Sequence, residues 1–205
     1  MKKDILICGV GGQGTVLSSK IIASAAMEEG NTVHSAETIG MAQRGGSVTS
    51  HVRLGEDSYS PLIPENSADL MLAFEPAEAA RNLGYLKKDG IVIVNRTPVR
   101  PVSQPAGDAV YDGSEIVKYL EENCDCFVVD SEELCAPFGS ARFFNIMILG
   151  IASGRGVLGL KKETLLSEIE KRVPARYAEV NKKAFLSGCE TGSEASGKRR
   201  KDEDK

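Results

Sequence analysis

Two glycine-rich segments near the start of the chain carry the polar atoms that could hold a ligand. The first is Gly9-Val-Gly-Gly-Gln-Gly14, which follows a short apolar run and precedes a pattern with helical spacing. Glycines at such a junction let backbone N–H groups approach an anion at the positive end of a helix. The spacing Gly-x-Gly-x-x-Gly therefore predicts a turn that either binds a phosphate-type group or only joins a strand to a helix.

The second segment is Met41-Ala-Gln-Arg-Gly-Gly-Ser-Val48, in which two glycines and a serine follow Arg44. A guanidinium can hold a carboxylate or a phosphate through two hydrogen bonds, and the glycines leave it uncovered. A solvated loop arginine is the alternative. Thr49, His51 and Arg53 share one face of the strand that follows, and this favours an interface because a polar face needs water or a partner. His51 by itself indicates a structural residue.

Neither segment contains a residue placed as a catalytic acid, base or nucleophile, so we predict no catalytic residue in this chain. The sequence has no P-loop, no Gly-x-Ser-x-Gly elbow and no Cys-x-x-Cys-x-x-Cys run. It also lacks Gly-Asp-Gly with a downstream Asn-Asn, the signature usually seen where thiamine diphosphate and magnesium bind. A catalytic centre assembled from this chain alone is therefore hard to find.

The five cysteines predict neither a disulfide framework nor a metal site. Metal and iron–sulfur sites usually need two-residue spacers, whereas Cys124-Asp-Cys126 has a spacer of one residue. On an extended strand this spacing puts both thiols on the same face. Cys135 could add a third ligand, but no fourth is evident, so we expect these residues to be core or surface thiols.

Length and composition suit one soluble α/β domain. The chain has 205 residues, of which 41% are hydrophobic and 26% charged, and its net charge is -4. That charge argues against a nucleic-acid binder, because no basic field would hold phosphates. The apolar run Ile5–Cys8 is too short for a signal peptide or a membrane span, so we expect a cytoplasmic protein that does not enter a membrane.

The elements that must position the two segments are strands that alternate with helices, as in α/β proteins. A buried strand over Ile5–Cys8 leads into the glycine turn, and Thr15–Glu29 has the spacing of a helix that stops at a glycine. A second strand is expected over Thr32–Ala36. Alternation over Val48–Leu54 predicts another strand, with Ser58–Leu62 pairing back on it as a hairpin. Such a hairpin would break a purely parallel pattern.

The second half of the chain continues this alternation of strands and helices and ends in helices. Strands are expected at Leu70–Phe74, Ile91–Val94 and Phe127–Val129. Helices are expected from Pro76 to about Tyr85, at Ser114–Glu122, at Arg142–Ile151 as a buried helix, and at Glu163–Val173 and Arg176–Leu186. From Gly188 the chain lacks apolar content. We therefore predict one domain over residues 1–187 and a disordered charged tail over 188–205.

Three kinds of function fit these residues. Glu37 lies a little over twenty residues beyond the glycine turn, where a ribose-binding acid could stand, so a stand-alone NAD-dependent oxidoreductase is one alternative. A small module that binds coenzyme A or a nucleotide and acts without any enzyme is another. The third is a non-catalytic subunit of a larger enzyme, which the missing cofactor motifs favour.

Four motifs in matching order carry a family resemblance. They are Gly9–Gly14, Gly40-Met-Ala-Gln-Arg-Gly-Gly-Ser-Val48, Ser60-Pro-Leu-Ile-Pro64 and Ala73-Phe-Glu-Pro-Ala-Glu78. The chain resembles the gamma-type component of the 2-oxoacid:ferredoxin oxidoreductases over about residues 4 to 186, and within them the beta subunits of the indolepyruvate enzymes. The Met-Ala-Gln-Arg-Gly-Gly-Ser string is the specific part of the match. The glycine turn alone would not be specific.

The resemblance implies a three-layer α/β/α, Rossmann-like domain with a mixed, mostly parallel sheet and a C-terminal helical segment. It implies one subunit of an enzyme that oxidatively decarboxylates an aryl 2-oxoacid such as indolepyruvate, forms the aryl-acetyl-CoA thioester and reduces ferredoxin. Thiamine diphosphate, magnesium and 4Fe–4S clusters would reside in an alpha-type partner, with no cofactor bound by this chain alone. Coenzyme A is the co-substrate, and the candidate ligand or interface residues are Gly9, Gly11, Gly12, Gln13, Gly14, Arg44 and Ser47.

Overall fold

The computed structural model of the chain describes residues 1–40, 45–56, 59–99 and 111–203. These residues form a six-stranded sheet in the order β2-β3-β1-β4-β5-β6. The strands are β1 (Lys3–Val10), β2 (Val33–Ile39), β3 (Ser47–Leu54), β4 (Ala68–Ala73), β5 (Leu86–Asn95) and β6 (Asp125–Val129). β1, β4, β5 and β6 pair in parallel, while β3 is antiparallel to both of its neighbours, β1 and β2. The predicted mixed, mostly parallel sheet is confirmed.

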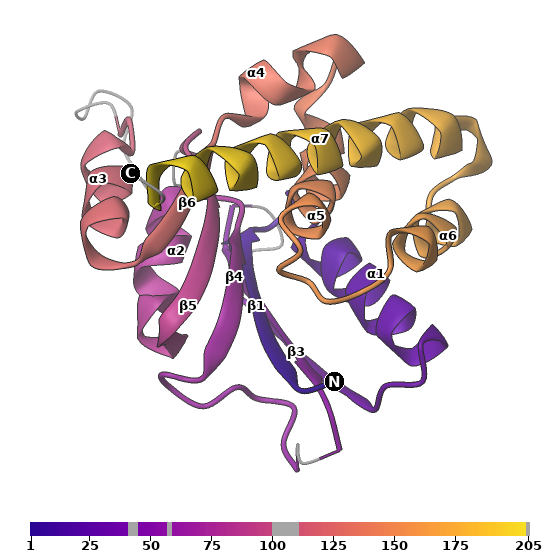
Figure 1. Cartoon of the computed structure of the whole chain (residues 1–205), viewed down its shortest axis with the longest axis horizontal. Coiled ribbons are helices and arrows are strands. Elements are labelled where there is room, and N and C mark those ends of the chain that lie inside the picture. Colours follow the sequence, from indigo (N-terminus) through magenta and orange to yellow (C-terminus); the bar gives the residue numbers. More distant parts are fainter. Residues whose placement is uncertain (41–44, 57–58, 100–110, 204–205) are drawn as a thin grey trace.

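Helices cover both faces of the sheet and make a three-layer arrangement (Figure 1). One face carries α1 (Thr15–Glu28), α5 (Phe144–Gly154), α6 (Lys162–Arg172) and α7 (Ala178–Glu203). The other face carries α2 (Pro76–Asn82) and α3 (Ser114–Asn123). The short helix α4 (Ser131–Cys135) follows β6, and 3-10 turns lie at Leu83–Tyr85, Ala136–Phe138, Ala141–Phe143 and Ala175–Tyr177. Within the described residues, no single helix is long and apolar enough to cross a membrane.

Alternation along the strands divides the core into two halves. Ile5 and Ile7 of β1 point into the half under α1 and α5, and Leu6 and Cys8 into the half under α2. The helices follow their sequence signals. Pro76 begins α2, and the Glu75 carboxylate caps that helix by accepting a hydrogen bond from the N–H of Glu78 at 3.0 Å.

The hairpin expected at Ser58–Leu62 is wrong for the residues described. Ser58 lies outside them, and residues 59–62 form no strand. Both edges of β3 are already paired, with β1 and β2, so no edge is left for a further strand. The guanidinium of Arg53 instead donates to the carbonyl oxygens of Ser60 and Leu62, at 3.0 and 3.2 Å, and ties this segment across the end of the sheet.

The polar face of β3 is covered by the chain itself, so the interface inferred from it is also wrong. Arg53 forms an ion pair with Asp4 at 2.9 Å. The ring of His51 is 4% exposed, packs edge-on against Tyr85, and accepts a hydrogen bond at Nδ1 from the N–H of Ile63. Burial, followed by the charge of Arg53, lowers the pKa of His51, which keeps the ring neutral. The structural interpretation of His51 is confirmed.

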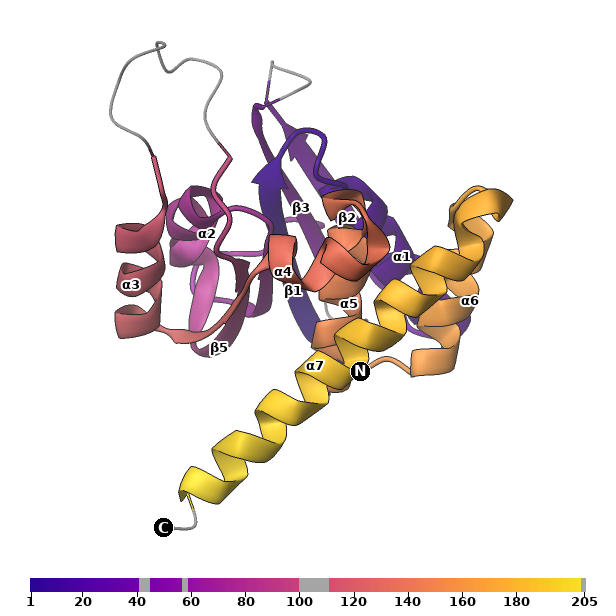
Figure 2. The ribbon, with the colours of Figure 1, turned by 90° about the horizontal axis from the view of Figure 1, so that it is seen from above.

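The C-terminal segment continues as helix α7 to Glu203, in place of the disordered tail expected from residue 188 (Figure 2). Gly188 and Gly192 lie against the backbone of α5. A Cβ atom on Gly188 would lie 2.3 Å from the carbonyl oxygen of Met147, and one on Gly150 would lie 2.1 Å from that of Phe185. The small residues that looked like a sign of disorder are therefore what lets two helix backbones touch.

Candidate functional site

The glycine turn lies at the edge of the sheet where the parallel strands end and β3 begins. Val10, the last residue of β1, pairs with Ser47, the first of β3. A cavity of about 410 Å³ opens at this edge, which we call the edge cavity. Its lining includes Gly12 and Gly14 of the turn and the polar side chains of Asn95, Thr97, Ser131, Glu132, Arg142 and Asn145.

Gly14 places the positive end of α1 at the edge cavity. It is the N-terminal cap residue of that helix, with φ +88, and no side chain caps the first turn. The first N–H groups of α1 are therefore left for a ligand or water. A Cβ atom on Gly14 would lie 2.5 Å from Nδ2 of Asn145, so glycine is required both for the backbone conformation and for this close approach.

Asn145 is a site residue that the sequence did not reveal. Its side chain is 8% exposed, lines the edge cavity, and has no hydrogen bond to any residue that the structure describes. Its main-chain oxygen accepts a hydrogen bond from the hydroxyl of Ser18 at 3.1 Å, which holds α5 against α1. A buried amide normally has a partner, so this one is available to a ligand. The only signal in the sequence was a lone amide in the apolar run Phe143–Leu149.

Asn95 fixes the opposite wall by joining the ends of three strands. Its Oδ1 accepts hydrogen bonds from the N–H of Ser131 at 3.0 Å and of Thr97 at 3.2 Å, and its Nδ2 donates to the carbonyl of Phe74 at 3.2 Å. The Ser131 hydroxyl donates to Oγ1 of Thr97 at 3.2 Å. The Thr97 hydroxyl hydrogen thus remains a donor for the edge cavity.

Arg142 supplies a positive charge to the edge cavity. It is exposed on the turn before α5, and no acid among the described residues forms an ion pair with it. The Glu132 carboxylate also lines the cavity and carries the opposite charge. A guanidinium, an uncapped helix N-terminus and an amide in one cavity form a surface suited to a phosphate group.

Three of the predicted ligand residues are used inside the fold. The Gln13 side chain accepts from the N–H of Val10 at 2.8 Å and donates to the carbonyl of Phe74 at 3.0 Å, which ties the turn to β4. A Cβ atom on Gly9 would lie 2.8 Å from Oε1 of Gln13. Gly11 donates to the carbonyl of Gly46 at 2.8 Å. Gly12 and Gly14 are the turn glycines that line the edge cavity.

The second glycine segment adjoins the turn but faces carboxylates. Arg44 lies outside the described residues. The Ser47 hydroxyl donates to Oε2 of Glu78 at 2.6 Å, and Arg81 forms an ion pair with the same carboxylate. Tyr111 donates to Oε1 of Glu75 at 2.7 Å, and Glu75 and Glu78 are both 2% exposed. These residues line a separate acidic pocket of about 250 Å³, whose charge disfavours an anion at Ser47.

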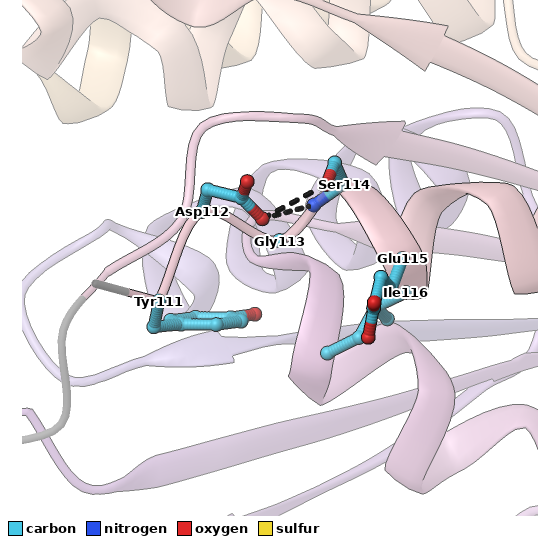
Figure 3. Close-up of a pocket in the computed structure, with 6 residues that line it drawn as sticks. All are labelled: Tyr111, Asp112, Gly113, Ser114, Glu115 and Ile116. Atoms are coloured by element: carbon cyan, nitrogen blue, oxygen red, sulfur yellow. Dashed lines mark hydrogen bonds between the residues drawn. The ribbon is translucent and has the colours of Figure 1, made fainter. Parts of the chain in front are cut away.

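A third pocket, of about 370 Å³, lies at the N-terminus of α3 and is lined by residues 111–116 (Figure 3). Oδ1 of Asp112 accepts hydrogen bonds from the N–H and the hydroxyl of Ser114, both at 2.9 Å. These bonds lower the pKa of Asp112. Because a carboxylate already occupies the positive end of α3, this pocket is unsuited to an anionic ligand.

Sheet topology argues against NAD at the glycine turn. In dinucleotide-binding folds the ribose-binding acid follows the strand next to the first one. Here β3 occupies that place, and Glu37 lies on β2, opposite Ser50 of β3. Its carboxylate accepts a hydrogen bond from the hydroxyl of Ser19 at 3.2 Å. One whole strand therefore separates Glu37 from the turn.

Metal-ligating side chains do not gather anywhere in the described part of the chain. No three His, Cys, Asp or Glu residues there are close enough together to hold an ion. All five cysteines are free thiols.

Comparison with known proteins identifies the family. The model of the pyruvate ferredoxin/flavodoxin oxidoreductase family matches residues 4–191. The chain belongs to this family. It is 37% identical over 194 residues to indolepyruvate oxidoreductase subunit IorB of Pyrococcus horikoshii, a match that covers 93% of this chain and 96% of that protein. The family resemblance drawn from the glycine segments is confirmed.

Solved structures of the oxidoreductase family share the fold. A keto/oxoacid ferredoxin oxidoreductase gamma subunit from Geobacter sulfurreducens PCA superposes with a TM-score of 0.69 at 24% identity, covering 93% of this chain and 98% of that one. The 2-oxoglutarate:ferredoxin oxidoreductase of Magnetococcus marinus, with 2-oxoglutarate, coenzyme A and succinyl-CoA bound, also gives 0.69, at 18% identity. The match covers 93% of this chain and 31% of that larger one.

Proposed function

We propose that this chain is the small subunit of an indolepyruvate:ferredoxin oxidoreductase of the cytoplasm. The observation that carries the proposal is the match to subunit IorB over 96% of that protein. In this proposal an alpha-type partner holds thiamine diphosphate, magnesium and the 4Fe–4S clusters, decarboxylates the aryl 2-oxoacid, and passes electrons to ferredoxin. The small subunit packs against that partner and helps to bind coenzyme A.

We assign the phosphate-bearing end of coenzyme A to the edge cavity. The first turn of α1 at Gly14 offers uncapped N–H groups, Arg142 offers a guanidinium, and Asn145 offers a largely buried amide that bonds to none of the described residues. A volume of about 410 Å³ falls in the range of ligand pockets, which run from about 300 to 1,000 Å³. The coenzyme A bound in the Magnetococcus enzyme supports the choice of ligand.

Steady-state kinetics of the assembled enzyme test both parts of the proposal. The chain is co-expressed with its alpha-type subunit, and ferredoxin reduction is followed with indolepyruvate while coenzyme A is varied. We expect Arg142→Ala to raise the KM for coenzyme A about tenfold with little change in kcat, because a hydrogen bond to a charged group contributes about 1.5–3 kcal/mol. Arg176→Ala is the matched control, since Arg176 is exposed and stacks on Tyr177 away from the edge cavity.

The two parts can fail separately. An unchanged KM for coenzyme A in Arg142→Ala would reject the edge cavity as its site and leave the subunit assignment standing. A chain that purifies alone beside a co-expressed alpha-type subunit would reject the subunit assignment itself.

Binding to the isolated chain separates the two remaining alternatives. Calorimetry with NADH is expected to show no heat of binding, because β3 separates Glu37 from the glycine turn. Heat with NADH would support a stand-alone oxidoreductase. Full activity of the alpha-type subunit without this chain, together with tight binding of coenzyme A by the chain, would support a regulatory module.

A further inference from the structure

Cys124 and Cys126 lie where α3 passes into β6, and both thiols face the same side of the sheet. Cys124, Cys126 and Val128 alternate toward α2 and α3, while Phe127 and Val129 face the opposite half of the core. Both cysteines are free and partly exposed. The Cys124 thiol donates to the carbonyl oxygen of Leu120 at 3.1 Å, and Cys126 follows two residues later on the same face, so the two thiols are neighbours.

From this geometry we infer that Cys124 and Cys126 are a redox-active dithiol that hydrogen peroxide converts to an intramolecular disulfide. In the first step the Cys124 thiolate attacks one peroxide oxygen, the O–O bond breaks, and a sulfenic acid and water form. In the second step the Cys126 sulfur attacks the Cys124 sulfur, and the S–O bond breaks with loss of a second water. Each cysteine gives up one proton, the sulfur atoms lose two electrons, and the peroxide oxygens gain them.

The environment assigns different roles to the two thiols. The neighbouring Cys126 thiol lowers the pKa of Cys124, whereas the pairing with Cys124 and then burial raise the pKa of Cys126. A thiol with a lowered pKa is the attacking nucleophile, and its neighbour resolves the sulfenic acid. Burial raises the pKa of Cys8, Cys135 and Cys189, so those thiols are expected to react slowly.

The backbone allows the bond to close at the price of strain. Alternate Cα atoms on an extended strand lie about 6.5–7 Å apart, at the upper limit of the 4.4–6.8 Å span of disulfides. Cys124 precedes β6 and is the C-terminal cap of α3, while β6 is the outermost strand and, among the described residues, pairs with β5 only. The junction of α3 and β6 can therefore shift without breaking hydrogen bonds to a second neighbouring strand. A strained disulfide of this kind is readily reduced.

Mass spectrometry of the full chain tests the inference. The reduced protein is treated with hydrogen peroxide, unfolded and alkylated. We expect the peptide holding Cys124 and Cys126 to lose two hydrogen atoms and take no alkyl group, while the other three cysteines are alkylated. Glutathione should restore both thiols, and a non-reducing gel should show no dimer. In Cys126→Ser, dimedone should trap a sulfenic acid on Cys124. Cys135→Ser, which removes a buried lone thiol, is the matched control and should behave like the wild type.

A second probe does not depend on any variant. Phenylarsine oxide binds pairs of adjacent thiols, and we expect the reduced wild type to take up one equivalent that protects both cysteines from alkylation. Full alkylation of both thiols after peroxide, or oxidation that stops at a sulfinic acid in the wild type, would overturn the inference. Equal sulfenic acid formation at Cys126 in Cys124→Ser would overturn the assigned roles.

Discussion

Gly14 and Asn145 are fixed against each other, although 130 residues of sequence lie between them. Gly14 adopts φ +88, and the Asn145 amide fills the space that a side chain would need. The glycine turn and its place before a helix could be predicted from spacing. Asn145 and Arg142 could not, because their link to the turn is made by packing of α5 on α1 and not by any pattern along the chain.

Gly14→Ala is expected to lower the free energy of unfolding by about 1–3 kcal/mol, because it adds backbone strain and a clash with Asn145. Urea denaturation measures the loss. Gly12→Ala is the control, since Gly12 has φ +104 and nothing lies within 4 Å of its Cβ position. The double variant Gly14→Ala/Asn145→Ala should recover part of the loss. Equal losses in Gly12→Ala and Gly14→Ala would refute the steric contribution.

Glu168→Gln is expected to destabilise the fold by about 1 kcal/mol at pH 7 and by less in acid. The Glu168 carboxylate accepts from Lys171 at 2.8 Å and pairs with Arg172 at 3.1 Å, both of them partly exposed to water. Burial works against ionisation, but these cations outweigh it and hold the pKa below its ordinary 4.5. Because the pKa is lower in the folded state, the ionised carboxylate stabilises the fold at pH values above 4.5. This stabilisation is lost as the pH falls through the lowered pKa.

Urea denaturation of the wild type and Glu168→Gln at several pH values checks this dependence. The difference between them should shrink as the pH falls below 4.5. Glu170→Gln on the same helix is the control, because the nearest cation to its carboxylate is Lys182 at 3.7 Å. A difference that is constant over the whole range would show that the charge of Glu168 contributes nothing.

At the scale of elements, periodicity predicted most helices and the parallel strands to within a few residues. Periodicity could not predict which strands pair with each other. The sequence showed β3 as an alternating strand, but its insertion between β1 and β2 depends on long-range hydrogen bonds. The predicted C-terminal helix ended too early for a different reason. Glycine and serine indicate disorder by composition, but Gly188 and Gly192 allow a close contact between two helices.

Gly150→Ala is expected to destabilise the protein by about 1–3 kcal/mol, since the new methyl group would overlap the backbone of α7. Thermal unfolding measures the effect. Gly84→Ala is the matched control, because nothing lies within 4 Å of its Cβ position and its backbone does not require glycine. An unchanged midpoint in Gly150→Ala would mean that α5 and α7 are not in backbone contact in solution.

At the scale of the whole molecule, the two glycine segments lie at the same edge of the sheet, but they line different pockets. The edge cavity holds Arg142 and the positive end of α1, while the acidic pocket holds Glu75 and Glu78 beside Ser47. Motif recognition predicted the family and the fold class, since strings such as Met41–Ser47 are specific to it. The division into a cavity that holds a guanidinium and a pocket that holds two buried carboxylates could not be predicted from the motifs, because Glu75 and Glu78 come from a strand–helix junction some thirty residues further along.

The contact between α5 and α7 also sets an order of events during synthesis. Residues Phe144–Ala152 of α5 are all buried, and the partner that covers much of this apolar helix is the last element of the chain. A ribosome therefore releases α5 before α7 can cover it, so until α7 follows the nascent chain exposes the side of α5 that faces away from α1 and the sheet. Chains that stop before Ala178 should bind a hydrophobic dye and aggregate, whereas a chain ending at Glu194 should not. Light scattering of the two truncated proteins distinguishes these outcomes. Completion of α7 is therefore the step that removes this aggregation-prone surface.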